Sequence, residues 1–198
     1  MKILEIIKKR RSVTRFSIRT VEKEKIDRVV QAASYDPPEG QKAPIKIVVI
    51  SGVEIKQKIR QTAEQIEKAY IQGAGNGNGD RELQLQLGET GWRKPFLEEA
   101  PYLVVACSLV GQPYQAASTW LALGRILLAA SDEGLGSLCY TPPMPAFLRK
   151  VISIPSKYMP IAIIPVGYSA EELFPTIADE DERKFRNLFS GRFNWQKP

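Results

Sequence analysis

The chain has 198 residues, 43% of them hydrophobic and 25% charged, so it can bury a core of its own. It contains no histidine and only two cysteines, which excludes a Ser-His-Asp triad, a Cys-His catalytic pair and histidine-bearing metal sites. We therefore expect no metal centre, and any enzymatic redox chemistry would belong to an organic cofactor. The formal net charge of +6 suits anionic ligands without distinguishing small molecules from polynucleotides.

The first element in the chain is a short amphipathic helix over residues 3–7, which leads into a basic segment at 8–16. This segment carries five cationic side chains and two hydroxyls. Arginine forks next to a serine hydroxyl are well suited to holding a phosphate, whereas a charged run of this kind can also be a plain solvated surface. Local sequence alone leaves both interpretations open.

A second helix is predicted after Thr20, which could cap it, and two prolines and a glycine over residues 36–40 force a loop behind it. The β-branched run Lys46–Ile50 predicts a central strand that is buried on both faces. A long polar helix then runs from Val53 to about Ile71. The alternating glycines at 73–79 do not match the GxGxxG dinucleotide fingerprint, so we interpret them as a linker or hinge.

The second half of the chain alternates further strands with helices. Ala116–Glu133 is apolar on nearly all faces, which places that helix either in the core or at a subunit interface. We expect one domain over residues 1–198, built as an α+β or α/β sandwich of one sheet with flanking helices. The remaining predicted elements are strands at Tyr102–Leu109, Gly136–Tyr140 and Pro160–Gly167, and a helix at about Ala146–Ile152.

Cys107 and Cys139 lie in apolar runs and form no CxxC pair, so we expect two buried, reduced thiols. The N-terminus carries charges where a signal peptide would be apolar, and no apolar run approaches about 18 residues. These features predict a cytoplasmic protein with no membrane partner. No helix-turn-helix, RNP or zinc-finger pattern supports nucleic-acid binding.

Four motifs occur in a family-specific order: Arg10-Arg11-Ser12-Val13, the proline-rich loop 37–44, the buried helix leading into Gly134-Leu-Gly136, and the run from Ile163 to Tyr168. With this order the chain resembles the FMN-dependent nitroreductase superfamily over nearly its whole length. The resemblance implies an α+β fold, a three-layer sandwich with a central mixed sheet flanked by helices. It further implies a domain-crossed homodimer with FMN at the subunit interface.

The same resemblance implies a set of flavin-binding residues. The FMN phosphate and ribityl chain would meet Arg10, Arg11 and Ser12, with Thr14 beside them. Thr141, the implied catalytic residue, would offer a hydroxyl or N–H near the flavin N5. The remaining implied contacts are Pro38 and Gln41 on the loop, Cys139 and Tyr140 before Thr141, and Arg183 at the phosphate, with Lys184 and Arg186 as competitors.

Within the superfamily the chain is most similar to the iodotyrosine deiodinase branch, on residues 55–60, Trp92-Arg93-Lys94 and Thr141-Pro142. That branch binds an amino-acid zwitterion with a Glu, a Tyr and a Lys on a lid, here residues of about 64–98, with a C-terminal extension at about 170–198. The implied substrate-binding residues are Gly40, Glu67, Tyr70 and Lys94. The Glu-to-Tyr spacing is one residue short, which rotates the side chain by about 100°. A solvated helix face is the alternative interpretation.

Five positions depart from the superfamily pattern: Thr14 replaces a basic residue, and Pro38, Gln41, Ala43 and Ile45 replace mostly polar ones. These losses remove expected hydrogen bonds at the flavin edge. Our main functional hypothesis is an FMN-dependent oxidoreductase that passes electrons from NAD(P)H to a small electron-poor aromatic acceptor, such as a nitroaromatic or a quinone. The alternatives are a reductive dehalogenase of halotyrosine-like phenols and a degenerate flavin-fold binding protein without turnover.

Overall fold

The computed structural model describes residues 2–35, 45–73, 91–111 and 113–170. The elements appear in the order α1 (Ile3–Lys9), α2 (Lys23–Gln31), η1 (Ala32–Ser34), β1 (Ile45–Ile50), α3 (Val53–Gly73), α5 (Phe96–Glu99), β2 (Tyr102–Leu109), α6 (Gln115–Asp132), β3 (Gly136–Ser137), η3 (Pro145–Phe147), α7 (Leu148–Val151) and β4 (Tyr158–Gly167). All four predicted strand regions therefore contain a strand.

The strands form one sheet in the order β1-β2-β4-β3, and every ladder between them is antiparallel. The sheet was expected to be mixed, but within the described residues its parallel pairing is confined to an isolated bridge between Ser12 and Ser137. A central strand, buried on both faces, was expected at Lys46–Ile50, whereas β1 stands at one end of the order of the described strands. β1 pairs only with β2 among the described strands, and its residues are mostly half-buried because an outer strand has a neighbour on one side.

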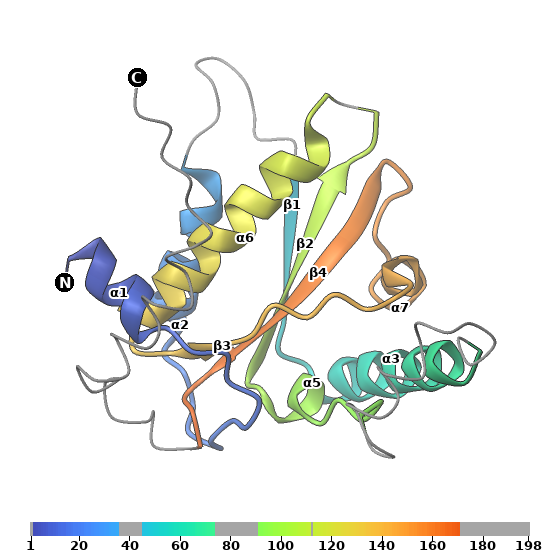
Figure 1. Cartoon of the computed structure of the whole chain (residues 1–198), viewed down its shortest axis with the longest axis horizontal. Coiled ribbons are helices and arrows are strands. Elements are labelled where there is room, and N and C mark those ends of the chain that lie inside the picture. Colours follow the sequence, from blue (N-terminus) through green and yellow to red (C-terminus); the bar gives the residue numbers. More distant parts are fainter. Residues whose placement is uncertain (1, 36–44, 74–90, 112, 171–198) are drawn as a thin grey trace, which may run out of the picture.

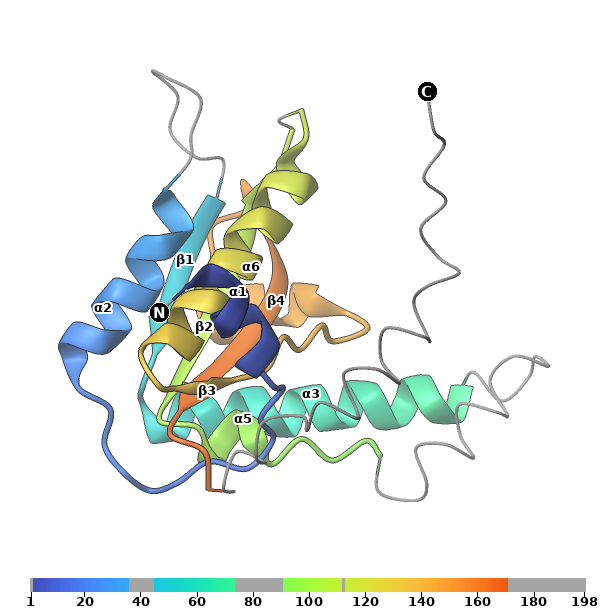
Figure 2. The ribbon, with the colours of Figure 1, turned by 60° about the vertical axis from the view of Figure 1, so that its left-hand side comes forward.

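Side chains of β2 point alternately into two cores on opposite faces of the sheet. Leu103 and Val105 join the cluster under α3, α5 and α7, whereas Val104 and Ala106 join the cluster under α2 and α6. Figures 1 and 2 show these helices on the two sides of the sheet. The structure thus has three layers, helices on a sheet on helices, which confirms the expected sandwich.

α6 buries one face and leaves another open. Leu123 and Ile126 are buried against the sheet, while Trp120 and Leu121 are 48% and 60% exposed. α1 packs beside α6 and exposes apolar side chains of its own. Among the described residues no helix is long and apolar enough to cross a membrane.

The boundaries of three shorter elements differ from the predicted ones. The strand expected at Gly136–Tyr140 ends at Ser137, and Tyr140 returns to the sheet only as a bridge to Ile163. The helix expected at 146–152 is a 3₁₀ turn followed by the single turn of α7. The N-cap position of the second helix is Glu22, not Thr20, and the Glu22 side chain makes no capping hydrogen bond.

One buried lysine connects α3 to the end of α5. Lys56 is 5% exposed, and its ammonium donates hydrogen bonds to the carbonyl oxygens of Glu98 (3.0 Å) and Ala100 (2.6 Å). These carbonyls belong to the C-terminal end of a helix, where backbone acceptors need outside partners. Burial lowers the pKa of Lys56, with the nearby Glu98 charge opposing that shift.

Replacing Lys56 with Met should lower the free energy of unfolding by about 2 kcal/mol, because it leaves buried carbonyls without donors. Lys58, exposed on the same helix, offers a matched control, and Lys58→Met should change stability by less than about 0.5 kcal/mol. Urea unfolding of both variants measures the difference. Equal effects would show that the two hydrogen bonds contribute nothing particular to the fold.

Both cysteines are free, as predicted; Cys107 is fully buried in β2 and Cys139 is partly buried. Burial raises the pKa of Cys107 to about 11, against an ordinary value of 9.0. Between these pH values the folded chain keeps a proton that the unfolded chain loses, so this thiol makes stability fall as pH rises through that window.

A Cys107→Ala variant should therefore approach the wild type in stability as the pH rises. At pH 8 the variant is less stable because of the cavity it creates. Between pH 9 and 11 the gap in unfolding free energy should narrow by about 2 kcal/mol, since only the wild type loses the thiol contribution. Lysine and tyrosine titration affects both proteins alike. A difference in unfolding free energy that stays constant from pH 9 to 11 would contradict the raised pKa of Cys107.

Candidate functional site

The basic segment after α1 lies against the short strand β3. Ser12 pairs with Ser137, and the N–H of Val13 donates to the carbonyl oxygen of Ser137 at 3.1 Å. Gly136 makes this approach possible, because a Cβ there would stand 2.8 Å from the side chain of Val13. Residues 12 and 13 are thereby fixed beside residues 136 and 137, although the two stretches are far apart in sequence.

Two buried polar atoms at this junction lack hydrogen-bond partners among the described residues: Nη1 of Arg10 and Oγ of Ser137. A buried guanidinium nitrogen without an acceptor is costly, so its environment favours an anionic ligand. Arg10 also lies close enough to Cys139 to oppose the upward shift that burial gives the pKa of that thiol. The guanidinium of Arg11 donates instead to the carbonyl oxygens of Lys8 (2.6 Å) and Arg10 (3.0 Å), which holds the turn after α1.

The chain leaves the sheet at Thr141. The preceding residue, Tyr140, exchanges two backbone hydrogen bonds with Ile163, at 2.9 and 2.8 Å. Ser12, Thr14 and Thr141 are exposed, so their hydroxyls are accessible to a ligand. The remaining residues assigned to the cofactor or substrate from the sequence, Pro38, Gly40, Gln41 and Arg183, lie outside the described residues.

A second cluster joins α3, the segment before α5 and Tyr140. Oε1 of Glu67 accepts a hydrogen bond from the hydroxyl of Tyr140 at 2.9 Å, and Oε2 lies 3.8 Å from the ammonium of Lys94. The side chains of Glu67 and Lys94 are each only 13% exposed. The ammonium of Lys94 also donates to the carbonyl oxygen of Gly91 at 2.6 Å. Two of the three predicted lid residues are thus brought together.

The third, Tyr70, lies three residues further along α3 and is 53% exposed. In this structure the hydroxyl that contacts Glu67 belongs to Tyr140. Burial and the negative charge of Glu67 raise the pKa of Tyr140, so its hydroxyl stays neutral and donates. Sequence reasoning placed Tyr140 at the flavin only, since no local pattern indicates a contact with a residue 73 positions away.

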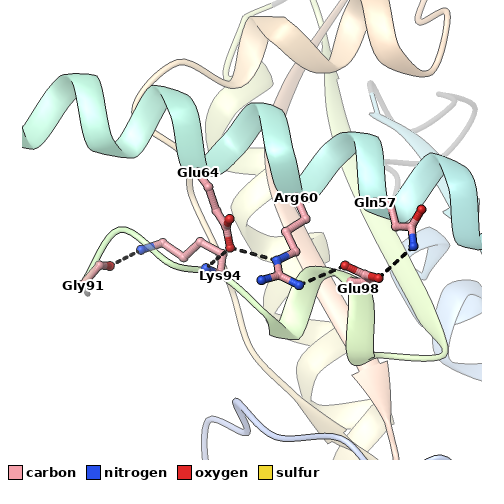
Figure 3. A network of polar contacts seen from close by, with 6 residues as sticks. All are labelled: Gln57, Arg60, Glu64, Gly91, Lys94 and Glu98. Atoms are coloured by element: carbon pink, nitrogen blue, oxygen red, sulfur yellow. Dashed lines mark hydrogen bonds and ion pairs between the residues drawn. The ribbon is translucent and has the colours of Figure 1, made fainter. Parts of the chain in front are cut away.

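A polar network fixes Lys94 against α3 (Figure 3). Oε1 of Glu64 accepts from the backbone N–H of Lys94 at 2.8 Å and from Nε of Arg60 at 2.9 Å. Arg60 also donates to Oε2 of Glu98 at 2.9 Å, and Glu98 accepts from Gln57 at 3.0 Å. The side chains of Arg60, Glu64 and Glu98 are at most about one third exposed, so the network is a positioning device for the segment carrying Lys94.

Comparisons with known proteins identify the family of the chain. The model of the nitroreductase family matches residues 7–168. The iodotyrosine deiodinase of Thermotoga neapolitana is 36% identical over 85% of this chain and 89% of the relative. That of Haliscomenobacter hydrossis is also 36% identical, over 87% of this chain and 82% of the relative.

Solved structures agree as well. A crystal structure of oxidised iodotyrosine deiodinase bound to FMN and 3-iodo-L-tyrosine superposes with a TM-score of 0.77, at 32% identity over 88% of this chain and 94% of that chain. An FMN-dependent nitroreductase from Clostridium difficile, at 22% identity and a TM-score of 0.70 over 98% of this chain and 99% of that one, shares the fold.

These relatives contradict the main functional hypothesis, a nitroaromatic or quinone reductase, because the similarity over nearly the whole chain is to deiodinases. They support the alternative drawn from the lid residues instead. The chain belongs to the nitroreductase family, in its iodotyrosine deiodinase branch.

Proposed function

We propose that this protein is an FMN-dependent reductive dehalogenase of halotyrosine-like phenols. The observation that carries the proposal is the pair formed by Glu67 and Lys94, two opposite charges held 3.8 Å apart and largely shielded from water. The pair lies on Tyr140, next to Thr141 at the proposed flavin edge. The relative with known ligands binds FMN and 3-iodo-L-tyrosine, which pairs a flavin with an amino-acid zwitterion.

The residues around Arg10 fit the phosphate end of FMN. A phosphate would supply acceptors for the unpartnered Nη1 of Arg10 and an oxygen partner for the buried hydroxyl of Ser137. Ser12, exposed on the same bridge, would add a donor. Arg11 would contribute charge while its guanidinium holds the turn. Thr14, Pro38, Gln41, Cys139 and Arg183 remain proposed members of this site.

The Glu67 and Lys94 pair suits a ligand with an ammonium and a carboxylate. Glu67 would take the ligand ammonium and Lys94 the ligand carboxylate, so each buried charge gains a partner of opposite sign. A shielded ion pair returns little net stability to the fold itself, because both charges lose their hydration. A role in binding the two charges of a ligand therefore explains the Glu67 and Lys94 pair better than a role in stabilising the fold does.

Bound FMN would supply the two electrons of the reductive step. The reaction replaces the carbon–halogen bond of the phenol by a carbon–hydrogen bond, consumes one proton and releases a halide ion. The residues of the chain bind and orient: the basic segment holds the phosphate, Thr141 presents a hydroxyl or N–H to the flavin edge, and the lid pair fixes the substrate. We propose NAD(P)H as the source of the electrons.

We also propose that the protein acts as a homodimer. α1 and α6 pack together, and we call their exposed apolar side chains the α1/α6 face. This exposure is best explained by a second copy of the chain that covers the face. Exposure is at least 48% for each of its members, which are Ile3, Leu4, Ile7, Trp120 and Leu121. The sequence predicted that the helix α6 lies either in the core or at a subunit interface, and with a second copy in place it would do both.

Replacing Glu67 with Gln or Lys94 with Met should weaken binding of 3-iodo-L-tyrosine about tenfold or more and leave binding of 2-iodophenol unchanged, because the phenol lacks the zwitterion. Arg10→Met should instead lower the affinity for FMN and leave the ratio of the 3-iodo-L-tyrosine affinity to the 2-iodophenol affinity unchanged. Titrations followed by flavin absorbance and fluorescence measure all three affinities.

Equal effects of the lid variants on both ligands would contradict the proposed clamp. A wild type that binds no FMN would overturn the proposed function altogether. A stable flavin complex that releases no halide, even with dithionite as reductant, would favour the binding-protein alternative.

Replacing Leu121 with Glu should convert the dimer to a monomer, because it places a charge on the α1/α6 face. FMN affinity should fall as well, because the family resemblance implies that FMN lies at the subunit interface. Val53, 60% exposed in the first turn of α3, provides the control, and Val53→Glu should stay dimeric. Light scattering during gel filtration gives the masses. A monomeric wild type, or a dimeric Leu121→Glu variant, would show that this face is not the interface.

A further inference from the structure

Tyr140 makes a contact that neither the flavin assignment nor the lid assignment explains. Its ring is 8% exposed and stands edge-on to Phe96, with centroids 5.6 Å apart and planes at 74°. Its backbone is fixed by the two hydrogen bonds to Ile163. A side chain held at both its backbone and its ring has little freedom, so the position of its hydroxyl is set by the sheet.

That hydroxyl fixes one oxygen of Glu67. Oε1 accepts from Tyr140 at 2.9 Å, and Oε2 is left facing the ammonium of Lys94 at 3.8 Å. A direct charge-assisted hydrogen bond between ammonium and carboxylate is about 2.7–2.9 Å long, so this pair is close without being closed. The ammonium is meanwhile held by the carbonyl oxygen of Gly91 at 2.6 Å. Both charged groups therefore keep capacity for a further partner.

We propose that Tyr140 is a positioning residue that holds Glu67 away from Lys94 and so keeps the lid pair open for a zwitterionic ligand. The inference rests on the proposed function and adds a determinant of substrate specificity to it. Without the hydroxyl, Glu67 would rotate and form a direct hydrogen bond to Lys94. A ligand would then have to break that bond before its ammonium and carboxylate could bind.

The position of Tyr140 in the chain gives the contact a second consequence. Tyr140 immediately precedes Thr141, so one short stretch touches both the lid helix α3 and the proposed flavin edge. A zwitterion bound to the lid pair would therefore lie close to the proposed flavin edge. A phenol without the amino-acid group does not engage this contact, and its binding is independent of the Tyr140 hydroxyl.

The test uses the FMN-loaded full-length protein and the variant Tyr140→Phe, which keeps the ring and the backbone bonds. We expect 3-iodo-L-tyrosine to bind about tenfold more weakly to the variant, while 2-iodophenol and FMN affinities stay within about twofold of the wild type. Tyr158→Phe is the matched control, because the ring of Tyr158 lies beside Lys46 and Lys157 instead, and it should leave all three affinities unchanged.

A double-mutant cycle separates positioning from general support of the fold. In a Glu67→Ala background, Tyr140→Phe should have little further effect on 3-iodo-L-tyrosine binding, because the hydroxyl then has no carboxylate to hold. The same cycle on unfolding free energy in urea, which needs no ligand, should show the two substitutions to be non-additive.

Four results would overturn the inference: tighter zwitterion binding by Tyr140→Phe, no change in zwitterion binding, equal weakening of both iodinated ligands, or additive effects in both cycles. Failure of the proposed function itself is seen in the wild type, which would bind no FMN or release no iodide. A wild type that works but is insensitive to Tyr140→Phe therefore rejects this inference alone.

Discussion

The arrangement of the site depends on two interactions of the Glu67 carboxylate, a hydrogen bond from Tyr140 and an ion pair with Lys94. The carboxylate is where a residue of α3, a residue of the segment before α5 and a residue of the sheet meet, through Lys94 and Tyr140. The charge is largely shielded from water, so its two oxygens need partners, and the partners come from elements far apart in sequence. The network through Glu64 and Arg60 then brings Lys94 to the same place from the helix side.

Residues 137–141 connect this lid cluster to the basic segment at the N-terminus. At one end Ser137 pairs with Ser12 beside Arg10, whose Nη1 has no hydrogen-bond partner within the described part of the chain, and at the other end Tyr140 reaches Glu67. Thr141 follows directly after Tyr140, so the proposed flavin edge lies one residue from the contact with the lid pair. The sheet holds this stretch in place, because β4 makes backbone hydrogen bonds to it.

Much of the fold was predictable, because strands such as β2 and helices such as α6 carry strong hydrophobic patterns. The position of β1 at one end of the described strands was not, since a β-branched run looks the same at an edge and in the middle. At the proposed site, motif order predicted roles for Arg10, Glu67 and Lys94, and the structure brings the last two together. The contact between Tyr140 and Glu67 was missed, because a hydrogen bond across 73 residues depends on tertiary packing and leaves no local signal. The same packing brings Gly136 against Val13.

The central claim is that the lid pair and the basic segment together serve reductive dehalogenation, and release of iodide in a single turnover tests it most directly. The purified protein, loaded with FMN and reduced by dithionite, is mixed with one equivalent of 3-iodo-L-tyrosine, and iodide and tyrosine are quantified. We predict nearly stoichiometric release of both products and reoxidation of the flavin. Stable reduced flavin with intact 3-iodo-L-tyrosine would contradict the account.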